Sequence, residues 1–318
     1  MSNERKINIF GPVPSRRLGQ SLGINNIPPK NCTYSCIYCQ IGRTKNTTFR
    51  RKSFYKPEEI KDAVDKKIKK LKKQIEQIDY ISFVPDGEPT LDINLGKEIK
   101  LLKTIGIRIA IISNASLLWR KDVQDDISNA DYVSLKIDTV NEKTWNKINK
   151  PHSSLNVSKI LSGIIEFSKE FNGNLVTETM IIKNLNDNTI ELEKISDLIL
   201  KINSSKSYIS IPTRPPAEEG VEMADEFDIN KAYQIFTEKG INTEFLTGYE
   251  GNKFAMTGNF IEDLLSITSV HPMREEGVKY LLSKTKESWD LVKDLIMKDK
   301  LIEVRYKNKK FYIRKLPF

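Results

Sequence analysis

The chain has 318 residues, with 51 Lys and Arg against 42 Asp and Glu, which gives a formal net charge of +9. Hydrophobic residues make up 39% of it, so wholesale disorder is excluded, and the length suits one barrel-sized domain with a small appendage or two ordinary domains. No run of about 18 uncharged apolar residues occurs, and the first ten residues hold no apolar signal-peptide core, so we expect a cytoplasmic protein that spans no membrane.

Strands and helices alternate along the first 250 residues. Apolar runs rich in β-branched residues predict strands at residues 21–27, 79–84, 107–113, 132–137, 174–182 and 208–212. The helical spacing of apolar residues predicts helices at residues 56–77, 93–105 and 189–202. Short strands that alternate with helices indicate parallel strands joined by βαβ units. We therefore predict an α/β fold, a partial (β/α)6 TIM-like barrel, and a doubly wound sheet is the alternative that periodicity does not exclude.

From about residue 257 the pattern changes to short helices followed by a hairpin. The sequence predicts helices at residues 261–267, 275–283 and 288–299, and strands at residues 301–306 and 310–314. This order is typical of a winged helix. We therefore divide the chain into a core domain, residues 1–250, and a winged-helix-like C-terminal module, residues 257–318.

Two segments are strongly basic. Residues 279–315 hold twelve Lys and Arg against five Asp and Glu, and residues 50–73 hold eleven against four. Such segments favour an anionic partner, and RNA is one candidate. The alternative is a solvated, lysine-rich face that binds nothing.

The only cysteines, Cys32, Cys36 and Cys39, lie within eight residues of one another. An odd number of cysteines in so short a segment makes a poor disulfide framework and indicates a metal centre instead. A [4Fe–4S] cluster normally takes four cysteines, so either a fourth ligand comes from elsewhere or one iron is left open for a small molecule. A structural zinc site, the main alternative, needs a fourth Cys or His. His152 and His271 are the only histidines, and both are more than a hundred residues away.

These cysteines and several other segments resemble the radical S-adenosylmethionine (radical SAM) superfamily. The Cys-x3-Cys-x2-Cys motif has an aromatic residue, Tyr38, just before its last cysteine. Residues 87–89 (Gly-Glu-Pro) follow a predicted strand, where the superfamily has a Gly-Gly-Glu-Pro-like motif, and Asp86 replaces its first glycine. Residues 11–19 and 212–216 resemble a subgroup of iron–sulfur oxidoreductases that is related to the wybutosine-synthesising enzymes.

The resemblance implies one [4Fe–4S] cluster, held by the three cysteines, and S-adenosylmethionine (SAM) as cosubstrate. The residues that it assigns to SAM binding are Tyr38, Gly87, Glu88, Asn114, Ser134, Lys136 and Asp138. Strand alternation agrees, because Ser134, Lys136 and Asp138 fall on one face of a predicted strand. Three polar groups on one buried face are costly unless they bind something. The alternatives are a structural Lys136–Asp138 pair, Glu88 as a helix cap and Asn114 as an ordinary turn residue.

By the same resemblance, a reduced cluster cleaves SAM to a 5′-deoxyadenosyl radical, which abstracts hydrogen from a substrate. We expect an electron donor such as flavodoxin or ferredoxin as a partner. Because one cluster takes every cysteine, none is left for a second cluster, which disfavours the wybutosine-type reaction itself. The leading hypothesis for the substrate is an RNA base. An activase or peptide-modifying enzyme is the second hypothesis, and a non-catalytic, metal-stabilised nucleic-acid-binding protein is the third.

Several residues outside these motifs allow two interpretations. Arg16 and Arg17 either hold a phosphate or carboxylate or brace the N-terminal segment. His152 either faces the substrate or makes a loop hydrogen bond, and His271 is interpreted as structural. Aromatic residues of the predicted wing, such as Phe311, are interpreted as core of the small module rather than as platforms for bases.

Overall fold

The computed structural model describes residues 7–72, 77–248, 251, 254, 256–285 and 287–315. Its main feature is an eight-stranded sheet whose strands are neighbours in chain order. The strands are β1 (Asn8–Ser15), β2 (Gly19–Asn25), β3 (Tyr80–Phe83), β4 (Arg108–Ser113), β5 (Tyr132–Lys136), β6 (Asn174–Met180), β7 (Lys206–Ser210) and β8 (Thr243–Leu246). Strands β2 to β8 run parallel, and β1 pairs antiparallel with β2 at one edge. Parallel strands in sequential order form a partial barrel, which stays open between β1 and β8 in the described structure, so the doubly wound alternative is excluded.

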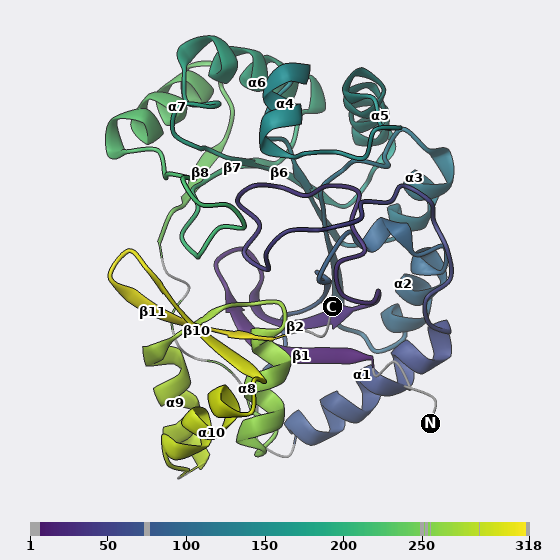
Figure 1. The fold of residues 1–318 in the computed structure, drawn as a ribbon. Helices are drawn as coiled ribbons and strands as arrows, with labels where there is room; N and C mark the ends of the chain where they lie inside the picture. The colour runs from purple at the N-terminus through teal and green to yellow at the C-terminus, as the bar shows by residue number, and fades with distance from the viewer. Residues whose placement is uncertain are drawn as a thin grey trace.

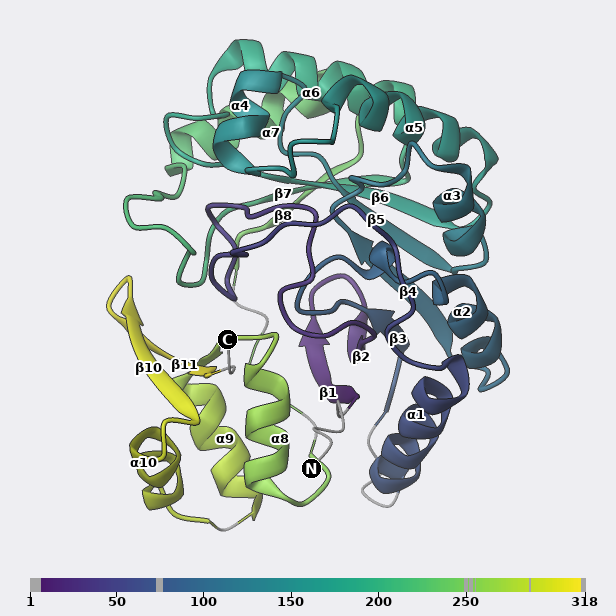
Figure 2. The ribbon, with the colours of Figure 1, turned by 45° about the vertical axis from the view of Figure 1, so that its right-hand side comes forward.

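Helices cover the outer face of this curved sheet (Figures 1 and 2). They are α1 (Pro57–Lys72), α2 (Leu95–Lys103), α3 (Lys121–Ile127), α4 (Glu142–Ile148), α5 (Val157–Glu170), α6 (Thr189–Ile202) and α7 (Glu226–Glu238), with a 3₁₀ turn, η1 (Pro89–Leu91). Helix α6 shows how the sequence sets their ends. The Oδ1 of Asn188 accepts a hydrogen bond from the backbone N of Glu191 (3.0 Å) at its start, and Asn203 ends it in the left-handed region at φ 52°.

The interior of the barrel is filled at the edge where the parallel strands begin. Tyr80, Tyr132 and Tyr208 point inward from β3, β5 and β7 and form a buried cluster with Leu18. Leu18 lies in the turn between β1 and β2, so this hairpin closes the lower end of the barrel. The space for a ligand therefore lies at the opposite edge, where the strands end and where barrels of this kind place their sites.

The C-terminal residues form a small module beside β1. Its elements are α8 (Phe260–Thr268), β9 (Met273–Arg274), α9 (Glu275–Thr285), α10 (Asp290–Met297), β10 (Leu301–Tyr306) and β11 (Lys309–Arg314). Its sheet has the order β10-β11-β9, and Lys307 and Asn308 take positive φ angles (50° and 59°), as a tight hairpin turn requires.

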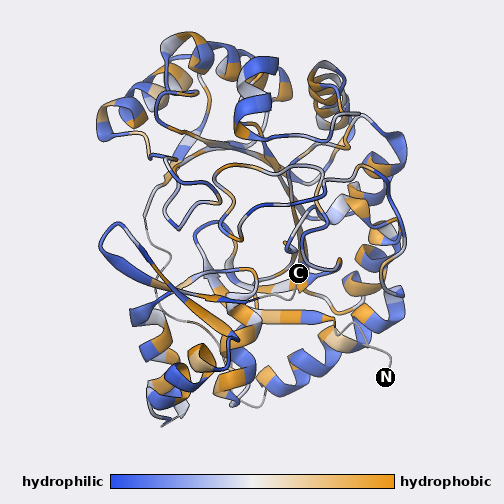
Figure 3. Cartoon of the chain, viewed as in Figure 1, coloured by the Kyte–Doolittle hydropathy of each residue, from blue (hydrophilic) through white to orange (hydrophobic). Residues whose placement is uncertain are grey.

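The module packs directly on the barrel. Phe10 and Val13 of β1 belong to the same hydrophobic cluster as the buried residues of α8, α9 and α10. Figure 3 shows β1 as largely apolar, whereas the tip of the β10–β11 hairpin is hydrophilic. The first strand of the chain therefore supplies part of the core of its last module.

The architecture confirms the predicted α/β barrel with a small C-terminal module. The six predicted strands correspond to β2 through β7, whereas the sequence does not predict β1, β8 or β9. Helix α1 is described as far as Lys72, and residues 73–76 of the predicted helix lie outside the described residues. The domain boundary near residue 250 stays a prediction. No helix in the described part of the chain is long and apolar enough to cross a membrane.

Candidate functional site

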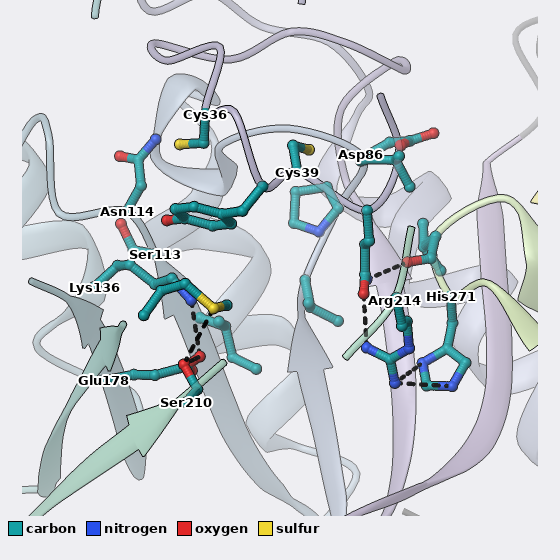
Figure 4. A pocket seen from close by; sticks show the side chains of 18 of the residues that line it. Cys36, Cys39, Asp86, Ser113, Asn114, Lys136, Glu178, Ser210, Arg214 and His271 are labelled. Carbon is teal, nitrogen blue, oxygen red and sulfur yellow. Dashed lines mark hydrogen bonds and ion pairs between the residues drawn. The ribbon is translucent and has the colours of Figure 1, made fainter. Parts of the chain in front are cut away.

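A cavity of about 380 Å³ lies at the carboxyl ends of the strands (Figure 4). This volume is within the range of small-molecule sites, about 300–1,000 Å³. All three cysteines line the cavity, together with five of the seven residues predicted to bind SAM. Those five are Tyr38, Gly87, Glu88, Asn114 and Lys136. The barrel thus gathers the cysteine motif and the strand ends around one space.

Residues 28–52, which we call the cluster loop, carry the cysteines across the mouth of the barrel (Figure 2). Backbone hydrogen bonds fix the loop on itself and on α4. The N of Thr48 donates to the O of Cys32 (2.9 Å), and the N of Ile37 donates to the O of Ile148 (2.9 Å). The cysteines are therefore held on a braced segment.

Burial opposes ionisation of the three thiols. Burial raises the pKa of the Cys32 thiol to about 12, and it also raises the pKa values of Cys36 and Cys39. A bound metal deprotonates its thiol ligands outright. The three partly exposed cysteines thus fit a metal centre whose positive charge stabilises the thiolates.

The donor set fits a cluster with three thiolate ligands. A single zinc ion needs its ligands about 2.0–2.3 Å from one centre. Among the described residues, no group of three or more His, Cys, Asp or Glu side chains is arranged to hold a single ion. In a [4Fe–4S] cube the ligands lie on separate irons, so this spacing does not conflict with a cluster.

Two amides lie beside the sulfur atoms. The Nδ2 of Asn114 is 3.6 Å from the Sγ of Cys32, and the Nδ2 of Asn149 is 3.4 Å from the Sγ of Cys36. Hydrogen bonds to thiolate ligands tune the potential of a cluster. Asn114 therefore has a place in the site beyond that of a turn former, and Asn149 is a site residue that the sequence analysis missed.

Glu88 braces the site from within. Its carboxylate accepts four hydrogen bonds, from the N and Oγ1 of Thr90, the Oγ of Ser113 and the N of Asn114, at 2.6–3.1 Å. Burial raises its pKa although these donors oppose the shift. It also caps η1, which confirms the capping alternative. Glu88 therefore fixes the position of the backbone of Asn114 while it lines the cavity.

Asp86 contrasts with Glu88 two residues away. It is fully buried, and neither oxygen of its carboxylate has a hydrogen-bond partner in the described structure. Burial raises its pKa to about 7, although the charges of Lys30 and Arg314 oppose the shift. The backbone cannot rotate to relieve this, because its N donates to the Oδ1 of Asn25 (3.1 Å) and its O accepts from the N of Lys30 (2.7 Å).

A charged network lies beneath the cavity and centres on Glu178 of β6. Glu178 pairs with Lys136 (2.8 Å) and with Arg17, and the Oγ of Ser210 donates to it (2.9 Å). Arg17 also donates to the Oγ of Ser134 (3.0 Å). Burial alone would raise the pKa of Glu178, but Lys136 and Arg17 lower it well below its usual range. Arg17 therefore braces the barrel interior from the β1–β2 turn.

Asp138 does not line the cavity but contacts Tyr38, which does. Strand β5 ends at Lys136, so Asp138 follows the strand, and its carboxylate accepts from the hydroxyl of Tyr38 (2.5 Å) and the Nδ2 of Asn149 (2.8 Å). The Nζ of Lys136 lies 5.2 Å from the centre of the Tyr38 ring. Ser134 and Asp138 do not line the cavity, so their predicted contact with SAM stays a prediction.

The opposite wall joins the cluster loop to the C-terminal module. The Nη1 of Arg214 donates to the Oε1 of Gln40 (2.6 Å), and its Nη2 lies 3.3 Å from the Nε2 of His271 (Figure 4). The Nε2 of Gln40 donates to the O of Val270 (2.9 Å). Thus Gln40, the residue after Cys39, ties the module to the site.

Two other predictions from the sequence concern His152 and the aromatic residues of the wing. His152 packs against Phe49, with ring centres 4.8 Å apart, and its Nδ1 accepts from the N of Ser154 (3.1 Å). It does not line the cavity, in agreement with the loop interpretation. Phe311 and Tyr312 are buried, which confirms that these two wing aromatics are core, whereas the third, Tyr306, is half-buried.

The fold and this cysteine-lined cavity define a radical SAM enzyme, and comparison with known proteins agrees. The family model described as "Radical SAM superfamily" matches residues 26–194, about half of the chain. The cofactors of this class are a [4Fe–4S] cluster and SAM. More narrowly, the chain belongs to the UPF0026 family: a "UPF0026 protein" of Methanocaldococcus jannaschii is 48% identical over 309 residues, 96% of this chain and 96% of that protein.

The chain is also similar to more distant proteins. An "S-adenosylmethionine-dependent nucleotide dehydratase" of Flammeovirga pacifica is 24% identical over 246 residues, 74% of this chain and 77% of that protein. Among solved structures, a radical SAM methyltransferase from Sphaerobacter thermophilus is 13% identical with a TM-score of 0.53, over 71% of this chain and 66% of that one. The second match shows a shared fold.

Proposed function

We propose that the protein cleaves SAM reductively and directs the resulting radical at a small anionic substrate. The observation that carries this proposal is that Cys32, Cys36 and Cys39 share one cavity with Glu88 and Lys136. When bound, the cluster and SAM supply a 5′-deoxyadenosyl radical that abstracts hydrogen. The protein supplies the placement of these groups and excludes water.

The chain's own residues have separate tasks in this proposal. Lys136, oriented by Glu178 and lying near the ring of Tyr38, offers a positive charge and a ring at the cavity floor. These two groups suit the carboxylate and adenine of SAM. Asn114, fixed by Glu88, lies next to Cys32. The positions of Lys136, Tyr38 and Asn114 thereby support their predicted contacts with SAM.

The charge of the cavity supports an anionic substrate. Its lining residues include five basic side chains against three acidic ones. The basic ones are Arg16, Arg17, Lys30, Lys136 and Arg214, and the acidic ones are Asp86, Glu88 and Glu178. Basic side chains attract an anion most strongly inside a cavity whose walls have a low dielectric constant. The name of the Flammeovirga relative, a nucleotide dehydratase, supports a nucleotide as that substrate.

An RNA base stays a prediction, with weaker support from the C-terminal module. Many of the lysines of the module pair within it, including Lys293 with Asp290 (2.9 Å) and Lys298 with Asp294 (2.7 Å). Paired charges attract phosphates less than unpaired ones. The protein-substrate hypothesis and the relation to wybutosine-synthesising enzymes also stay predictions.

Anaerobic reconstitution tests the proposal. The protein is loaded with iron and sulfide, reduced with dithionite and given SAM, and 5′-deoxyadenosine is measured by liquid chromatography. We expect its release from the wild type and none from Cys36→Ala. Colourless protein that holds zinc and releases no 5′-deoxyadenosine would refute the proposal and favour the non-catalytic hypothesis.

The substrate class is tested in cells with and without the gene. We expect a phosphate- or carboxylate-bearing metabolite, with a nucleotide foremost, to accumulate when the gene is absent. A change confined to modified nucleosides of RNA would favour the RNA base instead.

A further inference from the structure

The cluster loop is unusual in its charge. Residues 28–52 contain six Lys and Arg and no Asp or Glu. Acidic residues are in fact absent from residue 5 to residue 57. In a chain with 42 acidic residues, this gap leaves the loop above the cysteines with no negative side chain of its own.

Several of these charges face solvent together with those of α4. Arg43, Lys45 and Arg50 of the loop are exposed, as are Lys147 and Lys150 at the end of α4. We call these five residues the basic rim.

Part of the rim has no opposing charge. Lys45, Arg50 and Lys147 form no ion pair with any residue that the structure describes, whereas Arg43 and Lys150 share Glu218 (3.4 Å and 2.5 Å). With one acid for five bases, the rim keeps a positive potential.

The rim also lies close to the metal site. Arg43 is four residues beyond Cys39, and the hydrogen bond from Thr48 to Cys32 holds the loop next to the first cysteine. Lys147 precedes Ile148, whose O accepts from the N of Ile37. The cysteines face the cavity on one side of the loop, and the basic rim faces solvent.

We infer that the basic rim is the docking surface for a small acidic one-electron carrier protein. This inference rests on the proposed function, which requires an electron from outside. The carrier must approach the cluster from solvent, and the basic rim lies on the exposed part of the loop that holds the cysteines. Complementary charge speeds such encounters and fixes their orientation.

The observations favour a carrier over a nucleic acid. Binding of single-stranded nucleic acid commonly uses exposed aromatic rings as stacking platforms. Of the large hydrophobic side chains exposed in the described structure, none belongs to the cluster loop or to the end of α4. The rim offers positive charge but no aromatic stacking surface. This suits an acidic protein better than a single-stranded nucleic acid.

The electron balance of the docked complex is simple. The probe we choose is a flavodoxin, because its semiquinone absorbs differently from an iron–sulfur cluster. One electron leaves the flavin hydroquinone, which becomes the semiquinone, and the oxidised cluster gains that electron.

The test compares two doubly charge-reversed variants. Lys45→Glu with Arg50→Glu changes the rim. Lys169→Glu with Lys201→Glu is the matched control, since both lysines are exposed in the last turns of α5 and α6, at the opposite end of the barrel. Each variant is measured for flavodoxin affinity by calorimetry, with and without the cluster, and for the rate of semiquinone formation by stopped flow.

We expect the rim variant to bind flavodoxin at least about 10-fold more weakly at low salt, and to be reduced correspondingly more slowly. The control should behave as the wild type, and salt should slow the wild type far more than the rim variant. Equal affinity in the rim variant and the control would overturn the inference. So would rim-dependent binding of RNA with unchanged flavodoxin affinity.

Dithionite separates this inference from the proposed function. It reduces the cluster without docking, so the rim variant should still release 5′-deoxyadenosine with dithionite. If the wild type releases none with dithionite, the proposed function fails. If it does, and the rim reversal leaves flavodoxin affinity unchanged, only the docking surface is refuted.

Discussion

At the scale of single residues, the barrel interior depends on the buried carboxylate of Glu178, which neutralises two cations. In Glu178→Gln, the half-buried Lys136 and Arg17 lose the counter-charge of the buried carboxylate. Breaking a buried pair in this way costs about 3–5 kcal/mol, so we expect the free energy of unfolding in urea to fall by that amount. Glu244→Gln is the control, because Glu244 pairs with Lys206 at the surface, where loss costs about 0–1 kcal/mol. Equal losses in the two variants would show that the network contributes little.

The network around Glu178 also predicts how the stability of the protein depends on pH. Because the pKa of Glu178 is lowered in the folded protein, its stabilisation is present above the ordinary carboxyl pKa. It is lost as the pH falls through the lowered value of the folded state. Wild-type protein should therefore lose stability in acid more steeply than Glu178→Gln.

The raised pKa of Asp86 predicts the opposite pH dependence of stability. Its pKa is about 7 in the folded protein against an ordinary value of 3.8, so the folded state binds the extra proton and stability falls as the pH rises between these values. The ionised form costs on the order of 4 kcal/mol. We expect Asp86→Asn to stabilise the metal-free protein by up to about 4 kcal/mol at pH 8, and by much less at pH 5. Urea unfolding at both pH values measures this, and a gain independent of pH would contradict it.

At the scale of elements, the turn after β3 meets the cluster loop at Gly87. A Cβ at this position would lie 1.9 Å from the O of Asn31 and 2.8 Å from its carbonyl carbon, so backbone would have to move. We expect Gly87→Ala to lower the free energy of unfolding by about 1–3 kcal/mol and to reduce the iron bound after reconstitution. Gly248→Ala is the control, since nothing lies within 4 Å of its added Cβ. Normal iron content in Gly87→Ala would show that the loop tolerates the shift.

The elements also show what the sequence could and could not predict. Strands β2 to β7 have neighbours on both sides and helices outside, so their sequences are apolar runs that are easily identified. Strand β1 contains two prolines and a glycine, which are tolerated because it pairs on one side only, and β8 has four residues. Neither resembles a central strand.

A similar limit applies to the site. The cysteine motif is local and was identifiable from spacing alone. The pairing of Arg17 with Glu178 spans 161 residues, and that of Asn149 with Cys36 spans 113, so both depend on closure of the barrel. A hint was present in β6, where Glu178 interrupts an otherwise uncharged strand.

At the scale of the whole molecule, the C-terminal module and the barrel share one hydrophobic cluster. Phe10 and Val13 of β1 pack with buried residues of α8 to α10, and Lys67 of α1 pairs with the buried Asp263 of α8 (3.2 Å). We therefore expect one cooperative thermal transition for the full chain. Two separate transitions would show that the module folds independently.

Truncation of the chain after Gly248 is a stronger test of whether the barrel depends on the C-terminal module. Removal of the module exposes Phe10 and Val13 and leaves Lys67 without its partner, so β1 loses the apolar contacts that these two residues make with the module. Loss of a buried phenylalanine's packing alone costs about 3–5 kcal/mol, a large part of the usual stability of a domain. We expect the truncated chain to bind a hydrophobic dye and to unfold at a lower temperature than the full chain. An unchanged melting temperature and no dye binding would show that the barrel is stable without the module. The wall formed by Val270 and His271 would then be an addition to the site rather than part of its scaffold.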